Sequence, residues 1–215
     1  MSVILNRHMA SPATFQLVGG HLALDFINTV DWRTDAVHRR DLLDGFDDLL
    51  TWATAAGSLA PADRRTLVRA ARRDRTRAQR TLTRARRLRE VLARLLAPGA
   101  GAARTRARDL RTLNVFLGTA LRHRRLDAHA ASFAWGWSAA ANDVFDAVWW
   151  PIALAGAELA ASEDRHRIGV CSGEGCGWLF LDVSRNRRRR WCTMQGCGNR
   201  AKARRFYARA RAGTR

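Results

Sequence analysis

The chain has 215 residues, 47% of them hydrophobic, which suits one folded domain with a small appendage or two small domains. This composition excludes wholesale disorder and a collagen-like fibre. The 38 lysines and arginines against 19 aspartates and glutamates give a formal net charge of +19, which favours a polyanionic partner such as nucleic acid or an anionic membrane surface. Because every one of these cations except Lys202 is arginine, a GC-rich coding sequence is an alternative source of the excess.

Neither a membrane span nor a signal peptide is expected. The longest apolar stretch, residues 147–157, contains Pro151 and is shorter than the ~20 residues that cross a bilayer. The N-terminus lacks a charged segment followed by an apolar core, which is the pattern of a signal peptide. We therefore expect a cytoplasmic protein with reduced thiols and no membrane partner.

The predicted elements begin with a β-hairpin. Apolar and polar residues alternate on both sides of Gly19-Gly20, a pair that accepts the positive φ angles of a tight hairpin turn. The alternating apolar residues are Phe15, Leu17, Leu22, Leu24 and Phe26.

Helical spacing follows the hairpin. Apolar residues recur every three or four positions, which predicts helices at residues 42–53, from Pro61 onward, at residues 76–97 and at residues 104–122. Gly57 is suited to end the first of these helices in a left-handed conformation, and Pro61 to open the second.

One strand and one helix complete the N-terminal part. Alternation at residues 132–137 predicts a strand with Phe133, Trp135 and Trp137 on one face. Asn142 is suited to cap a last helix that bends or breaks near Pro151. We therefore expect a mainly α protein, in which a helical domain with a small hairpin or sheet precedes a small α+β unit. At about 160 residues the helical domain buries roughly 70% of its unfolded surface, so it folds without metal.

The domain boundary is predicted from charge. Residues 168–215 hold eleven arginines and Lys202 against only Glu174 and Asp182, and they contain all four cysteines. The polar stretch at residues 162–166 precedes them. The predicted domains are therefore residues 1–165 and residues 166–215.

The four cysteines predict a metal site. Two pairs, Cys171 with Cys176 and Cys192 with Cys197, each enclose four residues, and glycines flank the second cysteine of each pair. Such loops bring two thiolates to one side of a tetrahedral zinc ion. Two disulfides, four buried thiols or an iron–sulfur cluster are the alternatives. Since four cysteines fill the coordination shell, we expect one structural zinc, whose binding folds this small unit, and no zinc-hydrolase chemistry.

Cationic side chains surround the predicted zinc site. A weak strand at residues 178–183 leads into a loop with five arginines in six positions, and Gly198-Asn199 precedes a predicted helix from Arg200. On this helix, Ala203, Phe206, Tyr207 and Ala210 are predicted to face the zinc core. The candidate nucleic-acid contacts are Arg185, Arg187, Arg188, Arg200, Lys202 and Arg204.

Double-stranded DNA is the favoured partner of these cations, because guanidinium groups match phosphate oxygens and binding releases counterions. A solvated charged face and a basic helix lying on a membrane are the alternatives.

Several segments of the chain closely resemble the CGNR zinc-finger family, which is named for Cys197-Gly198-Asn199-Arg200. They are Cys176-Gly-Trp-Leu-Phe-Leu-Asp182, Ser184-Arg-Asn-Arg187, Arg190-Trp-Cys192 and Cys197-Gly-Asn-Arg-Ala-Lys-Ala203. Gly19-Gly-His-Leu-Ala-Leu-Asp-Phe-Ile-Asn-Thr29 is similar to the opening of the ABATE domain, the usual partner of that finger. The resemblance implies a bacterial, actinobacterial regulator of transcription that responds to stress, with zinc on the four cysteines.

The larger domain is expected to supply a small-molecule sensor site, a homodimer contact or both. Asp25, Asn28, Trp32 and Trp135 are candidate pocket residues, because ligand pockets combine apolar walls with a few polar groups. Helix capping, hydrogen bonds to backbone and core packing are the alternatives for these side chains.

No enzyme motif is present, and the six histidines are scattered, so no catalytic site is expected. We therefore predict a DNA-binding regulator of transcription. The alternative is an RNA- or ribosome-associated zinc protein that reads no sequence. In either case, replacing Cys176 by serine is expected to unfold the finger and leave the helical domain folded.

Overall fold

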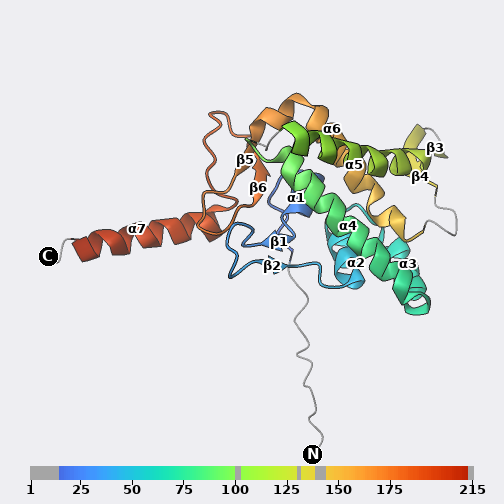
Figure 1. The fold of residues 1–215 in the computed structure, drawn as a ribbon, viewed down its shortest axis with the longest axis horizontal. Helices are drawn as coiled ribbons and strands as arrows, with labels where there is room; N and C mark the ends of the chain where they lie inside the picture. Colours follow the sequence, from blue (N-terminus) through green and yellow to red (C-terminus); the bar gives the residue numbers. More distant parts are fainter. Residues whose placement is uncertain (1–14, 100–102, 130–131, 139–143, 213–215) are drawn as a thin grey trace, which may run out of the picture.

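The computed structural model describes residues 15–99, 103–129, 132–138 and 144–212. Helices dominate the described part of the chain (Figure 1). They are α1 (Leu22–Ile27), α2 (Phe46–Ala55), α3 (Pro61–Arg73), α4 (Arg75–Leu96), α5 (Ala103–Arg122), α6 (Trp150–Ala161) and α7 (Asn199–Ala212), with short turns at Asp146–Val148, Glu163–Arg167 and Met194–Gly198. The mainly α fold class is confirmed.

Three antiparallel strand pairs accompany the helices in the described residues. The strands are β1 (Val30–Asp31) with β2 (Arg40–Asp41), β3 (Arg124–His129) with β4 (Ser132–Trp137), and β5 (Ile168–Val170) with β6 (Leu179–Leu181). The strand predicted at residues 132–137 is confirmed as β4.

The core lies between α4, α5 and α6, with α1 packed against α4, α6 and β6 (Figure 1). Burial of apolar side chains stabilises this arrangement, at about 25 cal/mol per Å² of apolar surface. Its largest fully buried side chains include Trp52, Trp149, Trp150 and Phe26. The finger contributes Ile168, Leu179 and Leu181 to the same core.

The predicted hairpin around Gly19-Gly20 is wrong. Gly20 does adopt a positive φ of 73°, but the chain then enters α1, and the side chain of His21 accepts a hydrogen bond from the Ala23 N–H at the helix start. Ala23, Leu24, Phe26 and Ile27 are buried. These buried residues lie on one face of a helix. The alternation of Leu22, Leu24 and Phe26 is too short a pattern to distinguish a strand from a helix.

The other helix predictions agree closely with the structure. Gly57 lies after α2 with a positive φ of 71°, and Pro61 opens α3. The helix predicted at residues 42–53 begins only at Phe46, because the Leu42 N–H donates to the Thr29 carbonyl beside the β1–β2 pair. Asn142 lies outside the described residues. The predicted break near Pro151 is confirmed: a short helical turn at Asp146–Val148 is followed by α6, in whose first turn Pro151 lies.

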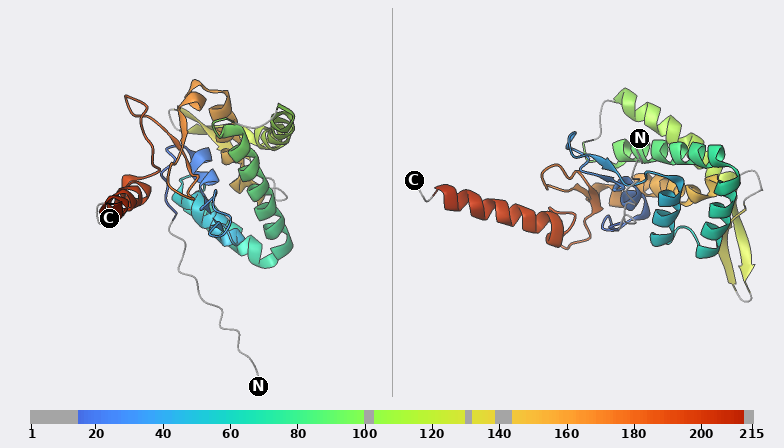
Figure 2. Two further views of the ribbon diagram at one scale, coloured as in Figure 1. Left: turned by 60° about the vertical axis from the view of Figure 1, so that its left-hand side comes forward. Right: turned by 90° about the horizontal axis from the view of Figure 1, so that it is seen from below.

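Helix α7 leaves the body of the molecule (Figures 1 and 2). The prediction that its apolar residues face the zinc core is wrong, since Phe206 and Tyr207 are 69% and 64% exposed and Ala203 and Ala210 are exposed as well. The helix starts directly after the turn Met194–Gly198 and points outward from it. None of the described helices is long and apolar enough to cross a membrane.

Candidate functional site

The four cysteines converge as the sequence predicts. Cys171 follows β5, Cys176 precedes β6, and Cys192 and Cys197 come from the loop and turn before α7. All four are buried, and their sulfur atoms lie within 4.8 Å of one another. Sulfur separations of 3.8 Å (Cys176 to Cys192) and 3.5 Å (Cys192 to Cys197) fit a tetrahedral zinc site, because Zn–S bonds of about 2.3 Å place the sulfurs about 3.8 Å apart.

Hydrogen-bond donors surround two of the four sulfurs. The N–H groups of Gly173 and Cys192 donate to Cys171 Sγ at 3.4 and 3.2 Å. Hydrogen bonds from the Cys176 and Cys192 thiols hold the pKa of Cys171 far below its usual value, and the same contacts raise the pKa of Cys176 and Cys192. Arg200 Nη2 donates to Cys197 Sγ at 3.0 Å, and this bond raises the pKa of Arg200.

One glycine of the cysteine loop is required by a close approach. Gly175 has a φ of 72°, and a β-carbon there would lie 2.6 Å from Trp32 Cε3. The Trp32 ring also lies under the Arg200 guanidinium, 5.0 Å from its centroid. Trp32 therefore packs beside the cysteine loop, between Gly175 and Arg200.

The finger is joined to the helical domain by hydrogen bonds in which at least one partner is a backbone group. The Asn28 side chain donates to and accepts from the Leu179 backbone, at 2.8 Å in both directions. Trp178 Nε1 donates to the Val30 carbonyl at 3.0 Å, and the Arg33 N–H donates to the Cys176 carbonyl at 3.0 Å. We call these contacts the seam. They place the metal ligands at a fixed position on the larger domain.

Residues 184–190, which we call the arginine loop, are shaped by a buried carboxylate. Asp182 accepts hydrogen bonds from Ser184 N and Oγ and from the Arg189 N–H. These bonds, above all the one from the Ser184 side chain, lower the pKa of Asp182. The loop turns at Arg187, which has a φ of 48°. Arg185, Arg187, Arg188 and Arg190 are exposed as a result.

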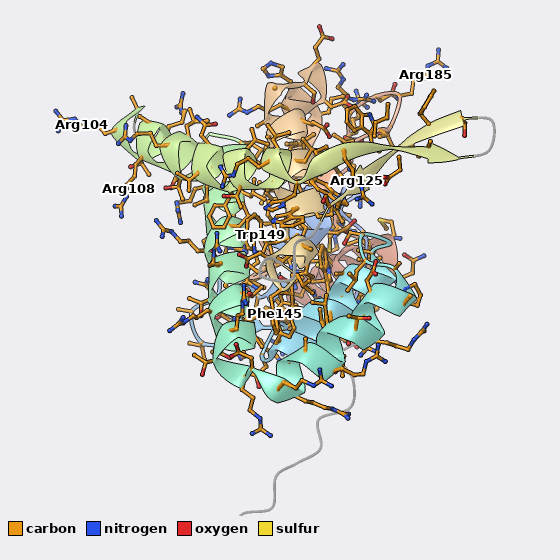
Figure 3. The ribbon with its side chains drawn as sticks, turned by 90° about the vertical axis from the view of Figure 1, so that its right-hand side faces the viewer. Arg104, Arg108, Arg125, Phe145, Trp149 and Arg185 are labelled. Atoms are coloured by element: carbon orange, nitrogen blue, oxygen red, sulfur yellow. The ribbon has the colours of Figure 1, made fainter. Side chains whose placement is uncertain are left out.

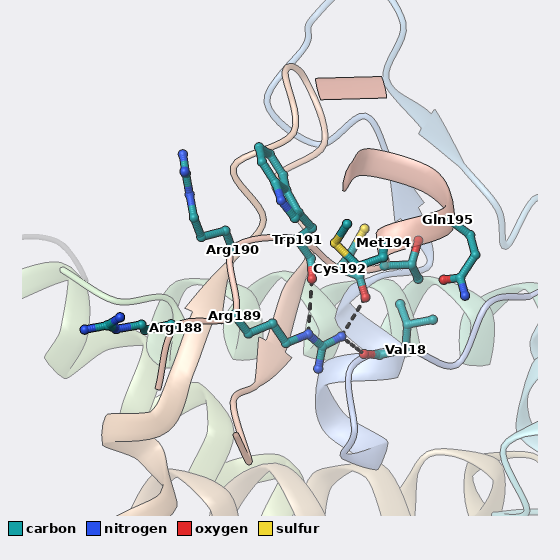
Figure 4. A pocket seen from close by; sticks show the side chains of 9 residues that line it. Val18, Arg188, Arg189, Arg190, Trp191, Cys192, Met194 and Gln195 are labelled. Atoms are coloured by element: carbon teal, nitrogen blue, oxygen red, sulfur yellow. Dashed lines mark hydrogen bonds between the residues drawn. The ribbon is translucent and has the colours of Figure 1, made fainter. Parts of the chain in front are cut away.

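Arg189 has a different role, which the sequence gives no means of separating from its neighbours. Its guanidinium donates to the carbonyls of Val18, Trp191 and Cys192 (Figure 4) and lies over the Phe180 ring at 4.3 Å. It lines a groove of about 720 Å³ beside the metal site, together with Arg188, Arg190 and Trp191 (Figure 4). Arg189 therefore ties the arginine loop to the finger core.

All six predicted nucleic-acid residues are exposed. Arg200 is held by Cys197 and Trp32, and Arg204 forms a surface ion pair with Glu174 at 3.5 Å. The structure brings Arg185, Arg187 and Arg188 together on the arginine loop and places Arg200, Lys202 and Arg204 on α7.

The four predicted pocket residues are not brought together. Asp25 Oδ1 accepts the Gly19 N–H at 2.7 Å, and burial raises the pKa of this carboxyl. Asn28 lies in the seam and Trp32 against the cysteine loop. Trp135 is 65% exposed on β4. Three of these side chains make the structural contacts that were the alternative to a ligand pocket.

Two families match the chain. Residues 20–163 match the ABATE family, whose description is "Putative stress-induced transcription regulator". Residues 167–210 match the CGNR zinc finger. No curated protein matches the chain. The two matches agree with the geometry, in which one zinc held by four cysteines has a structural role.

Proposed function

The chain belongs to the ABATE family and carries a CGNR zinc finger with one structural zinc, and we propose that it regulates transcription by binding double-stranded DNA through this finger. The observation that carries the proposal is the placement of cations. Two exposed basic elements flank the second cysteine pair: the arginine loop leads into Cys192, and α7 follows the turn that contains Cys197. Their positions relative to one another are therefore set by the metal and by the seam.

Helix α7 has the size and charge of a groove-binding element. Its 14 residues span about 21 Å, and a helix fits the major groove, which is about 12 Å wide. The helix contains no acidic residue, and its exposed cations include Lys202, Arg204, Arg205 and Arg209. Binding of these cations to DNA phosphates would release condensed counterions, which favours the complex.

The arginine loop would add phosphate contacts. Arg185 and Arg188 have no guanidinium partner among the described residues. A free guanidinium binds phosphate oxygens with two parallel hydrogen bonds. The Asp182 contacts hold the loop backbone in place, which reduces the entropy lost when these side chains bind.

A second candidate function is RNA binding without sequence readout. The observation that favours it is the exposure of Phe206 and Tyr207 on α7. Exposed aromatic rings stack on unpaired bases, which are available in RNA loops and absent from duplex DNA.

Regulation in response to stress, in the cytoplasm, would be the task of the larger domain. A cavity of about 230 Å³ lies between α3, β4 and α6, and its lining includes Leu67, Trp137, Pro151 and the carboxylate of Asp63. Apolar walls with one charged group are typical of small-molecule sites. This cavity supports an effector site at a place other than the four residues predicted from the sequence. A homodimer would double the DNA contacts.

Fluorescence anisotropy with the full-length, zinc-loaded protein tests DNA binding. Duplex DNA and a structured RNA are titrated at several salt concentrations. If about six phosphates are neutralised, the logarithm of the DNA association constant should fall with a slope of about −5 per logarithm of salt concentration. The double variant Arg185→Ala/Arg188→Ala should bind DNA at least tenfold more weakly, with a slope shallower by about two.

The matched control is Arg65→Ala/Arg80→Ala, which removes two exposed arginines from α3 and α4. It should change DNA affinity less than twofold. Equal losses in both variants would mean that only net charge matters. Tighter binding to RNA than to duplex DNA would favour the second function.

A further inference from the structure

The hairpin of β3 and β4 projects from the end of the molecule opposite α7 (Figures 1 and 2). It continues the line of α5, as the positions of Arg104 and Arg125 show (Figure 3). The strands pair antiparallel, with Leu126 opposite Trp135 and Ala128 opposite Phe133. These apolar residues share one face, and Leu126, Phe133 and Trp135 are 55%, 74% and 65% exposed.

Aromatic contacts hold the base of the hairpin against the core, whereas the side chains farther out are exposed. Trp137 packs against Trp150 at a centroid distance of 5.9 Å, and Arg124 lies over the Trp135 and Trp137 rings at 5.1 and 4.5 Å. A two-stranded hairpin without further packing is only marginally stable in water. An exposed apolar face on such a ribbon marks a contact surface.

We propose that this hairpin is the contact of a homodimer, in which β3 of one copy pairs antiparallel with β3 of a second copy, centred on Leu126. The free edge of β3 is available for this pairing, because β4 is its one strand partner among the described residues. The pairing would join two hairpins into a four-stranded sheet and bring Leu126 against the partner's Leu126. The inference specifies the homodimer of the proposed function, and its test uses no DNA.

Charge complementarity identifies the second copy as the occupant. Arg125 and Asp127 lie on the face opposite Leu126, and their side chains form an ion pair at 2.8 Å. Two-fold pairing about Leu126 places Arg125 opposite the partner's Asp127, and Asp127 opposite the partner's Arg125. Opposite charges directly across an antiparallel pair stabilise it, and like charges destabilise it. The short sequence Arg125-Leu126-Asp127 is thus complementary to itself.

The position and size of the hairpin agree with this assignment. Since it lies at the end opposite α7 (Figure 1), pairing leaves both fingers accessible and keeps two strongly cationic bodies apart. Edge pairing buries Leu126 against its counterpart and leaves Phe133 and Trp135, which lie on the outer strand β4, on the open face of the four-stranded sheet, so the buried area is well below the ~800 Å² per partner of a standard interface. The dimer should therefore be concentration-dependent.

Sedimentation velocity on the full-length protein, without nucleic acid, tests the proposal between about 1 and 200 µM. The wild-type protein should dimerise within this range. Asp127→Arg places arginine opposite arginine, and Arg125→Asp places aspartate opposite aspartate, so each variant alone should be monomeric. A mixture of the two variants should dimerise, because each charge then faces its opposite. The double variant Arg125→Asp/Asp127→Arg should also dimerise.

The mixture separates contacts between copies from the ion pair within one copy, since both single variants lack the internal pair and circular dichroism checks that both are folded. Single variants that dimerise as the wild type does, or a mixture that stays monomeric, would overturn the proposed pairing. Wild-type protein that is monomeric at 200 µM would do the same. If Leu126→Ser lowers affinity for RNA in a separate titration and leaves the sedimenting mass unchanged, the hairpin binds nucleic acid and the dimer proposal is wrong.

Discussion

Arg89 on α4 is a charged residue placed inside the protein, with a side chain only 3% exposed. Its guanidinium donates two hydrogen bonds to Asp41, at 2.8 and 2.6 Å, and a third to Thr29 Oγ1. Removing two charges from water costs several kcal/mol per ion, so such a pair is tolerated only with this complete set of partners. The network connects α4 to the β1–β2 pair, from which the seam to the finger starts.

Asp41 predicts a pH dependence of stability. Burial raises the pKa of its carboxyl, but the hydrogen bonds and charge of Arg89 outweigh burial and leave that pKa below its usual value. A lowered folded-state pKa contributes stability above the unfolded pKa of about 3.9, and this contribution is lost as the pH falls through the folded pKa. Asp41→Asn should therefore lower the free energy of unfolding by about 2–4 kcal/mol at pH 7, and the gap to wild type should narrow below about pH 4.

Urea denaturation at pH 7 and below about pH 4 measures the difference in the free energy of unfolding between Asp41→Asn and wild type. Asp47→Asn is the control, because Asp47 forms an exposed pair with Arg64 and its side chain is 71% exposed. This substitution should cost less than about 0.5 kcal/mol. A gap for Asp41→Asn that is independent of pH would contradict the role given to Arg89.

At the scale of elements, the segment between β1 and β2 clamps the first cysteine loop. The N–H groups of Arg33 and Thr34 donate to the carbonyls of Cys176 and Gly175. Arg33 continues to Glu90 on α4, at 2.9 Å. One loop of the helical domain thus contacts both the metal ligands and the buried ion pairs, and its fit against Gly175 leaves no room for a side chain.

Gly175→Ala and Gly57→Ala form a matched pair that tests this fit. Both glycines have a φ near 70°, but a β-carbon at Gly57 would meet nothing within 4 Å. Gly57→Ala should cost about 1 kcal/mol for the left-handed backbone alone. Gly175→Ala should cost a further 1–3 kcal/mol or so, because its β-carbon would overlap Trp32. Thermal unfolding gives the costs, and zinc release to a colorimetric chelator should be faster in Gly175→Ala only. Equal costs would mean that Trp32 moves aside freely.

At the scale of the whole molecule, the finger and the helical domain share one core. Ile168, Leu179 and Leu181 pack among the residues of the larger domain, and the seam satisfies buried backbone groups of both. The expectation that a finger variant unfolds the finger alone therefore needs revision. We now expect the two parts to lose stability together.

Zinc removal tests this coupling. If about 3 kcal/mol of seam contacts are lost, the melting temperature of the helical signal should fall by roughly 6–12 °C in the chelated protein and in Cys176→Ser. Adding zinc back should restore the chelated wild-type protein and leave the variant unchanged. A helical signal that melts at the same temperature with and without zinc would show that the larger domain is independent of the finger.

Most helices and the metal ligands could be predicted from sequence alone. Long segments with a helical spacing of apolar residues, such as α4 and α5, predict their structure from neighbours along the chain. Four cysteines in two pairs of equal spacing predict a zinc site in the same way. The first helix could not be predicted this way, because six residues carry too short a pattern. Arg189 could not be separated from Arg188 either, since only the fold brings the Val18 and Cys192 carbonyls to its guanidinium.

What the sequence determined by itself was therefore whatever depends on neighbours along the chain: helical periodicity, turn residues, ligand type and charge. What only the tertiary structure decided was which polar side chains face another segment. Asn28 forms hydrogen bonds with Leu179 and Trp32 lies against Arg200, contacts that join residues far apart in the chain, whereas Trp135 is exposed on a hairpin. Such roles depend on which surfaces pack together, and packing energy belongs to the whole core and to no single segment.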